Sequence, residues 1–207
     1  MTLLPEVWRK VPVHAIVTDV GSTKAAIVRA AEDLAAGRPL AFVGSHPMAG
    51  SEQSGYAVAR VDLFRGATVI VTPTPKTDPA AARGVAELWR AVGARVASLP
   101  PEEHDEVVAL ISHLPHLVAY ALVDAVGRVN GRAVDFAARG FKDTTRIAAS
   151  DPQMWREIFL TNRVAMDRAL AAFEVALEDL KALIAANDAA GLDRVLGAIR
   201  SQREQVR

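Results

Sequence analysis

Short apolar runs alternate with amphipathic segments in the first half of the chain. Each amphipathic segment has apolar residues at helical spacing and a glycine just after it, which predicts helices over 23–36 and 79–92. Strands are expected at 15–20, 40–44, 67–72 and 95–99. Strands that alternate with helices indicate parallel pairing through right-handed crossovers.

Apolar residues three and four positions apart dominate the second half. They predict a helix over 102–128, kinked near His113 because Pro115 removes a backbone hydrogen bond. Ser150-Asp151-Pro152 begins a long helix to about residue 186, and a final helix follows. We therefore expect an α/β domain at 1–100 and an all-helical domain at 101–207. The heptad-like spacing in the long helix favours a homodimer through the helical domain.

The amino-acid composition limits the binding partners and the cellular location that we expect. The 24 basic residues balance the 24 acidic ones, which gives no indication of a nucleic-acid or acidic-membrane partner. The chain has no cysteine, which excludes disulfides and thiolate chemistry. We find no signal-peptide pattern and no apolar run near the ~20 residues that a membrane span needs. The expected location is therefore cytoplasmic.

The segment 42–55 is the most conspicuous candidate for a site, because His46 follows a strand and is surrounded by glycine, serine and glutamate. Ser22 follows the preceding strand, and the carboxyl ends of neighbouring parallel strands meet at one edge. Ser22 also stands near a helix N-terminus, where N–H groups favour a polar or negative ligand. Histidine suits a general base, whereas a Ser/His nucleophilic pair lacks the G-x-S-x-G turn and a third acid.

The other histidines give weaker signals. We expect His14 and His104 to be solvent-exposed. His113 and His116 share one side of a helix, but no third ligand stands at suitable spacing, so no metal site is predicted. Arg146 is one of 24 basic residues, so by itself it is only weak evidence of a ligand-binding group.

Five motifs in register closely resemble the prephenate dehydrogenase family, which includes arogenate dehydrogenases. They are DVGSTK at 19–24, SHPMAGSE at 45–52, SHLPH at 112–116, GFKDTTRIA at 140–148 and DPQMWR at 151–156. The resemblance implies a Rossmann-like nucleotide-binding domain followed by a helical dimerisation domain. It also implies NAD(P)-dependent oxidative decarboxylation of prephenate to 4-hydroxyphenylpyruvate in tyrosine biosynthesis, or the arogenate equivalent.

The resemblance further implies roles for individual residues. His46 would accept the proton of the substrate's ring hydroxyl, and Ser22 would hold both His46 and that hydroxyl. His113 would meet the pyruvyl side chain and Arg146 a substrate carboxylate. The remaining implied residues are Ser51, Glu52 and Trp155 around the substrate, and Gly21 with Ser22 beside the cofactor.

The family's opening strand, G-x-G-x-x-G turn and helix are absent from these 207 residues. We therefore expect an N-terminally truncated member, with a partial Rossmann-like sheet that lacks its first βαβ half and exposes the strand at 15–20 as an edge. The choice between NAD and NADP, and the activity of the truncated chain, stay open. The alternative hypothesis is a non-catalytic helical dimer module that retains a substrate-binding or regulatory surface.

Overall fold

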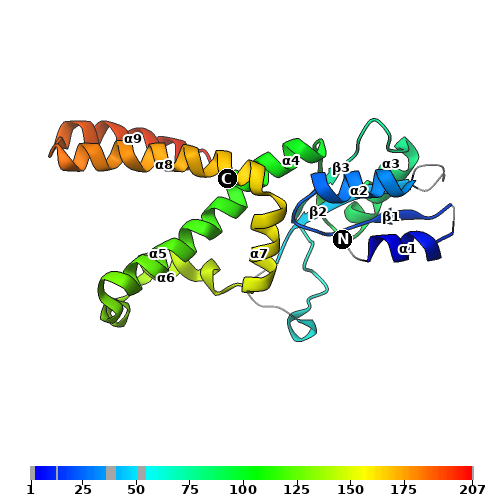
Figure 1. Ribbon diagram of the computed structural model, residues 1–207, viewed down its shortest axis with the longest axis horizontal. Coiled ribbons are helices and arrows are strands. Elements are labelled where there is room, and N and C mark those ends of the chain that lie inside the picture. Colours follow the sequence, from blue (N-terminus) through cyan, green and yellow to red (C-terminus); the bar gives the residue numbers. More distant parts are fainter. Residues whose placement is uncertain (1–2, 13, 36–40, 51–54, 207) are drawn as a thin grey trace. The chain divides into compact units, whose positions relative to one another are not determined.

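The computed structural model describes residues 3–12, 14–35, 41–50 and 55–206 (Figure 1). The chain divides into two compact units, Met1–Met166 and Asp167–Arg207. The predicted domain boundary near residue 100 stays a prediction.

Among the described residues, four strands form one sheet in the first unit. Its strands follow the order β1 (Ile16–Thr18), β2 (Ala41–Met48), β3 (Thr68–Thr72) and β4 (Arg95–Ser98). β1 pairs with β2 and β3 with β4 in parallel, whereas β2 and β3 pair antiparallel. The expectation of parallel pairing throughout is therefore wrong at one place. Parallel neighbours need a long crossover, and the described part of the β2–β3 connection holds only one short 3₁₀ turn, η1 (Tyr56–Val58).

β2 is longer than predicted, and this changes the position of His46. The strand continues past Gly44 to Met48, so His46 lies within it, opposite Ile70 of β3. Pro47 is tolerated because β1 pairs with β2 only as far as Val43, and no other described strand pairs with the later part of β2 on that side.

Helices cover both faces of the sheet. Successive residues of a strand point to opposite faces. Val43 packs with Val85 and Trp89 of α3 (Pro79–Ala91). Its neighbour Phe42 packs against the cluster formed by α1 (Leu4–Lys10) and α2 (Ala25–Ala35). The sheet is thus a middle layer, with α3 on one face and α1 and α2 on the other.

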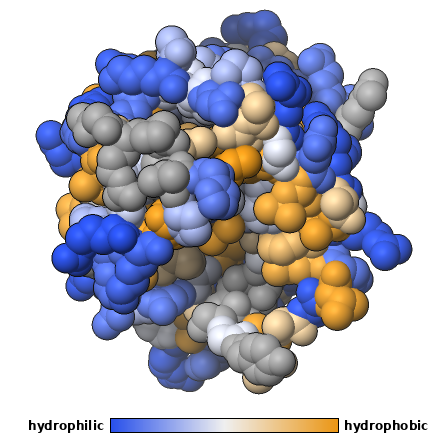
Figure 2. Space-filling model, turned by 90° about the vertical axis from the view of Figure 1, so that its right-hand side faces the viewer, coloured by the Kyte–Doolittle hydropathy of each residue, from blue (hydrophilic) through white to orange (hydrophobic). Residues whose placement is uncertain are grey.

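β1 forms one edge of the sheet among the described strands, as expected. Ile16 on this strand is 48% exposed. Figure 2 shows the face that lies on the right in Figure 1, where α1, β1 and α3 are found. On this face, apolar patches in orange alternate with hydrophilic ones in blue.

The predicted helix over 102–128 is interrupted where a kink was expected. It consists of α4 (Pro101–Val108), the π-helical turn η2 (Ala109–His113) and α5 (Leu114–Asn130). The N–H of Leu114 donates to the carbonyl of Ala109, five residues back. This wider turn immediately precedes Pro115, which has no N–H to continue the regular pattern.

The rest of the chain is also helical, but the predicted single helix over 152–186 is wrong. The chain leaves helical geometry at Asn162, which is buried and has φ −107° and ψ 26°. Asp151 caps the first part by accepting the N–H groups of Gln153 and Met154, as predicted. The elements after α5 are η3 (Gly131–Phe136), α6 (Arg139–Thr145), η4 (Arg146–Ala149), α7 (Pro152–Thr161), α8 (Arg163–Ala185) and α9 (Ala189–Glu204).

One helical run in the described residues, Pro101–Phe136, is long and apolar enough to cross a membrane. This differs from the sequence-based expectation. Length and composition are weak evidence here, because core helices of soluble proteins pass the same test. The run also carries His104, Asp105 and His113, all of which are buried within the first unit.

Candidate active site

A cavity of about 600 Å³ lies in the first unit, and it brings together most of the predicted site residues. This size suits a small-molecule ligand. Its lining includes Val20, Ser22, His46, Pro47, Met48, Ser112, His113, His116, Arg146, Ile147, Ser150, Met154, Trp155 and Ile158. Two predicted residues, Ser51 and Glu52, lie outside the described part of the chain. The chemical roles assigned to all these residues stay predictions.

His46 is held in the centre of this arrangement by its position in β2. Only 7% of the residue is exposed, and its Nδ1 lies 2.8 Å from Nε2 of His104. Burial lowers the pKa of His46 to about 3, and repulsion from His104 and Lys24 adds to the effect. The imidazole is therefore neutral at pH 7, and it is a weak base in the free protein.

His104 is the main residue that sequence reasoning missed. It was expected to be solvent-exposed, but it is fully buried in α4. Its Nε2 contacts His46, and its Nδ1 lies 2.8 Å from Oδ1 of Asp105. The available signal was its spacing: His104 is four residues before Val108, so both lie on the buried face of α4.

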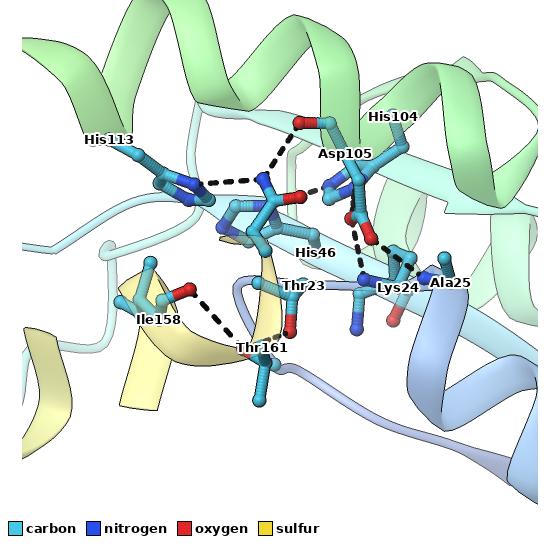
Figure 3. A network of polar contacts seen from close by, with 12 residues as sticks. Thr23, Lys24, Ala25, His46, His104, Asp105, His113, Ile158 and Thr161 are labelled. Atoms are coloured by element: carbon cyan, nitrogen blue, oxygen red, sulfur yellow. Dashed lines mark hydrogen bonds and ion pairs between the residues drawn. The ribbon is translucent and has the colours of Figure 1, made fainter. Parts of the chain in front are cut away.

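Asp105 connects this histidine pair to the start of α2. Its Oδ1 accepts the N–H of Lys24 at 2.7 Å, and its Oδ2 accepts the N–H of Ala25 at 2.9 Å (Figure 3). The helix N-terminus that was expected to favour a ligand thus binds a carboxylate of the chain itself. Burial alone would raise the pKa of Asp105, but hydrogen bonds from His104, Ala25 and Lys24 outweigh it and lower the pKa.

The turn that carries Gly21 and Ser22 is fixed by a buried ion pair. Lys24 is fully buried and pairs with Asp19, and burial lowers the pKa of the lysine in spite of this partner. Asp19 also accepts the N–H groups of Gly21 at 2.9 Å and Ser45 at 3.1 Å. A Cβ on Gly21 would lie 3.0 Å from Asp19 Oδ2, so this close turn favours glycine. The predicted role of Gly21 in cofactor binding stays a prediction.

Ser22 shares the cavity with His46, as the sheet-edge argument expected. The partner of His46 Nδ1 is nevertheless His104, whereas the family resemblance had assigned the orienting role to Ser22. That role of Ser22 stays a prediction.

His113 is anchored by Asn162, at the break between α7 and α8. His113 is 1% exposed, and its Nδ1 lies 3.1 Å from Nδ2 of Asn162. The same amide nitrogen donates to the backbone carbonyl of Asp105 at 2.8 Å. Burial is the main cause that lowers the pKa of His113 to about 4. Its Nε2 is buried without a hydrogen-bond partner among the described residues.

His116 lines the cavity but was not predicted as part of the site. Its ring stacks on Trp155 with centroids 3.5 Å apart and planes 22° apart. Its Nδ1 lies 2.8 Å from the Ser112 carbonyl. Burial, and to a smaller extent the charge of Arg146, lower the pKa of His116. Trp155 therefore lies directly against this histidine, and Arg146 lines the same cavity.

Comparisons with known proteins match the chain along almost its whole length. Residues 1–98 match the family model for the prephenate dehydrogenase nucleotide-binding domain, and residues 100–198 match the model for the prephenate dehydrogenase dimerization domain. The prephenate dehydrogenase of Bacillus subtilis is 39% identical over 195 residues, which are 91% of this chain and 52% of that protein.

Solved structures give the same likeness in three dimensions. The prephenate dehydrogenase of Aquifex aeolicus, in complex with hydroxyphenyl propionate and NAD+, is 38% identical and has a TM-score of 0.92 over 100% of this chain and 72% of its own. The arogenate dehydrogenase of Synechocystis is 32% identical and has a TM-score of 0.84 over 99% of this chain and 74% of its own. The chain spans about half the length of the curated relatives it matches.

Proposed function

Because this chain belongs to the prephenate dehydrogenase family, we propose that it acts in the NAD(P)-dependent oxidative decarboxylation of prephenate or arogenate. The observation that carries the proposal is a buried, neutral His46 in the lining of a cavity that Ser22 and Arg146 also line. With prephenate the product is 4-hydroxyphenylpyruvate, on the route to tyrosine.

His46 is the proposed base. It accepts the proton of the ring 4-hydroxyl as the hydrogen on C4 leaves with its electron pair. The bound nicotinamide supplies the hydride acceptor. The ring carboxylate leaves as carbon dioxide, and its bonding pair completes the aromatic ring. The proton on His46 then returns to the phenolate oxygen, so prephenate and NAD+ give 4-hydroxyphenylpyruvate, carbon dioxide and NADH with no net proton released.

The negative charge of the substrate matters for both binding and basicity. Arg146 is the proposed partner of a substrate carboxylate, because a guanidinium binds carboxylates through paired hydrogen bonds. A bound anion also favours the charged form of a nearby imidazole. It therefore raises the pKa of His46 from its low value in the free protein.

His113 is the proposed donor to the pyruvyl side chain. Asn162 donates to the Asp105 carbonyl through Nδ2, which fixes its amide orientation and makes the same nitrogen the donor to His113 Nδ1. The hydrogen of the neutral His113 ring is therefore on Nε2, which has no hydrogen-bond partner in the described part of the protein. His116, stacked on Trp155, extends the same side of the cavity.

The cavity residues fit the nicotinamide end of the cofactor. Val20 is 62% exposed and lines the cavity together with Ser22, so the cavity that His46 lines also has an apolar surface and a hydroxyl. The N–H groups of Lys24 and Ala25 are used by Asp105, so they do not provide a pyrophosphate site. The glycine motif that binds the pyrophosphate in the family is not part of this sequence.

A paired activity and binding assay tests the proposal. The chain is incubated with prephenate and NAD+ or NADP+, reduced nicotinamide is followed by absorbance, and prephenate binding is measured by calorimetry. His46→Asn should lower kcat by roughly 10²- to 10⁴-fold, the usual contribution of a general base, while substrate binding persists. The matched control is the exposed His14→Asn. An unchanged kcat in His46→Asn, or a chain that does not bind prephenate, contradicts the proposal.

The alternative of a non-catalytic dimer module is not favoured, because the relatives that match most of the chain are dehydrogenases. Self-association remains part of the proposal. Residues 100–198 match a dimerization domain, and Ile111 and Val129 are 64% and 88% exposed. A second copy of the chain would cover such apolar helix surface. This accounts for the apolar run Pro101–Phe136 without a membrane and agrees with a cytoplasmic location.

A further inference from the structure

We propose that His104 and Asp105 are positioning residues that fix the tautomer of His46, with its hydrogen on Nδ1 and its lone pair on Nε2. The catalytic consequence rests on the proposed function. The tautomer itself depends only on contacts within this chain, and it can be tested without substrate or cofactor.

The argument starts at the carboxylate of Asp105. Two backbone N–H groups, those of Lys24 and Ala25, donate to it, and they favour its ionised form. An ionised carboxylate has no hydrogen to donate. Nδ1 of His104, 2.8 Å from Asp105 Oδ1, therefore carries the hydrogen of that contact.

The tautomer of His104 then determines that of His46. A neutral imidazole has one N–H, so a hydrogen on Nδ1 of His104 leaves Nε2 as an acceptor. Nε2 of His104 is 2.8 Å from Nδ1 of His46, and this distance requires a hydrogen between them. His46 must therefore donate through Nδ1, and its Nε2 keeps the lone pair that a base needs.

Burial and anchoring make this order of hydrogens persistent. His104 is fully buried and Asp105 is 6% exposed, so water does not compete for these contacts. The backbone carbonyl of Asp105 accepts the amide of Asn162 at 2.8 Å, which ties α4 to the break between α7 and α8. Figure 3 shows His104 and Asp105 of α4 close to His46 of β2 and to Lys24 and Ala25 at the start of α2.

The arrangement also helps His46 to take up a proton. A proton on Nε2 gives the His46 ring a positive charge, and the Nδ1–H bond to His104 becomes charge-assisted. The Asp105 carboxylate lies at the far side of His104 and stabilises that charge. The pair thus orients the base, and the charge of Asp105 offsets part of the lowering of the His46 pKa by burial.

The substitution Asp105→Asn makes the reverse order of hydrogens possible. Asp105 Oδ1 accepts both the N–H of Lys24 and the Nδ1–H of His104, whereas Oδ2 accepts the N–H of Ala25. An amide oxygen in place of Oδ1 keeps the first two contacts, whereas an amide nitrogen there gives up the Lys24 contact and donates to Nδ1 of His104. In this second orientation His104 donates through Nε2 to Nδ1 of His46, and the hydrogen of His46 moves to Nε2. The base is left without its lone pair at that atom, as when an asparagine replaces the aspartate of a Ser-His-Asp triad.

Nitrogen-15 NMR of the imidazole rings in the 207-residue chain at neutral pH tests this directly. We expect His46 and His104 each to show a protonated Nδ1 and an unprotonated Nε2, with the exchanged assignments populated as well in Asp105→Asn. Substitution of each histidine assigns its signals, and Glu103→Gln, exposed on the same helix, is the matched control. A protonated Nε2 on His46 in the wild type overturns the proposal.

A second pair of variants keeps the test decisive if Asp105→Asn does not fold. His104→Gln retains an oxygen that can accept the Nδ1–H of His46, whereas His104→Leu does not. We expect the His46 tautomer to persist in the first variant and to become mixed in the second. Identical His46 spectra in the two variants contradict the proposal.

Kinetics give the second measurement. In an active preparation, Asp105→Asn should lower kcat by up to about 10⁴-fold with little change in KM, by analogy with the triad, and Glu103→Gln should leave both unchanged. A change in KM alone argues against the positioning role. The expected tautomers in a chain without turnover would count against the proposed function and not against this inference.

Discussion

Two histidines of the site have pKa values well below that of a free histidine side chain. His46 and His113 are buried, and burial is the first cause of the lowered pKa of each, to about 3 and about 4. The unfolded chain returns both groups to a pKa near 6.5. The folded and unfolded states therefore bind different numbers of protons below pH 6.5. This difference makes the free energy of unfolding depend on pH.

The free energy of unfolding should decrease as the pH falls from about 6.5 to about 4. In that range the unfolded chain takes up protons on these histidines and the folded chain does not, so acid favours unfolding. Above pH 6.5 both states hold them neutral and the effect vanishes. One pKa unit corresponds to about 1.4 kcal/mol, so a loss of a few kcal/mol is expected in urea unfolding curves. A His113→Asn variant should show a smaller loss, and exposed His14→Asn should show the wild-type loss.

Arg146 should act on binding more than on the chemical step. If it contacts a substrate carboxylate in both the ground state and the transition state, Arg146→Ala raises KM and changes kcat little. An increase in KM of roughly 10- to 100-fold corresponds to losing one charge-assisted contact of about 1.5–3 kcal/mol. Steady-state kinetics with varied prephenate measure this, with exposed Arg156→Ala as the control. A lowered kcat with unchanged KM would argue against the carboxylate role.

The elements of the fold show what sequence patterns could and could not predict. All four strands and the helix starts at Pro79 and Pro152 were found, because short aliphatic runs and capping aspartates are local signals. The antiparallel β2–β3 pairing was not found, because it depends on the connection rather than on either strand. His104 was missed because polar neighbours in α4 concealed its buried position.

The break at Asn162 was missed for a related reason, since apolar residues continue at helical spacing through α7 and α8. Its cause is tertiary: the amide bonds both the Asp105 carbonyl and His113. Asn162→Leu should leave these buried groups without a partner and lower the free energy of unfolding by about 1–3 kcal/mol. Urea unfolding measures this, and exposed Gln202→Leu should stay within about 0.5 kcal/mol of the wild type. An equal effect of the two substitutions would show that the amide contacts contribute little.

At the scale of the whole molecule, the main prediction concerns association. Exposed apolar positions occur in both compact units, for example Ile111 in the first and Ile184 in the second, which are 64% and 65% exposed. We expect light scattering after gel filtration to give twice the chain mass of 22.1 kDa. A monomer at micromolar concentration would contradict the proposed homodimer.

The contacts of Asp105 also have a consequence for how the protein reaches its working form. They join Asp105 to Lys24, which is 81 positions away along the chain, and to Asn162, which is 57 positions away. Contacts between distant parts of a chain form only after the intervening segments have been closed into loops, which is slow. A folding intermediate with its sheet and helices already formed could therefore still lack an oriented base. Recovery of His46 function should then follow the slowest refolding phase and not the first appearance of secondary structure.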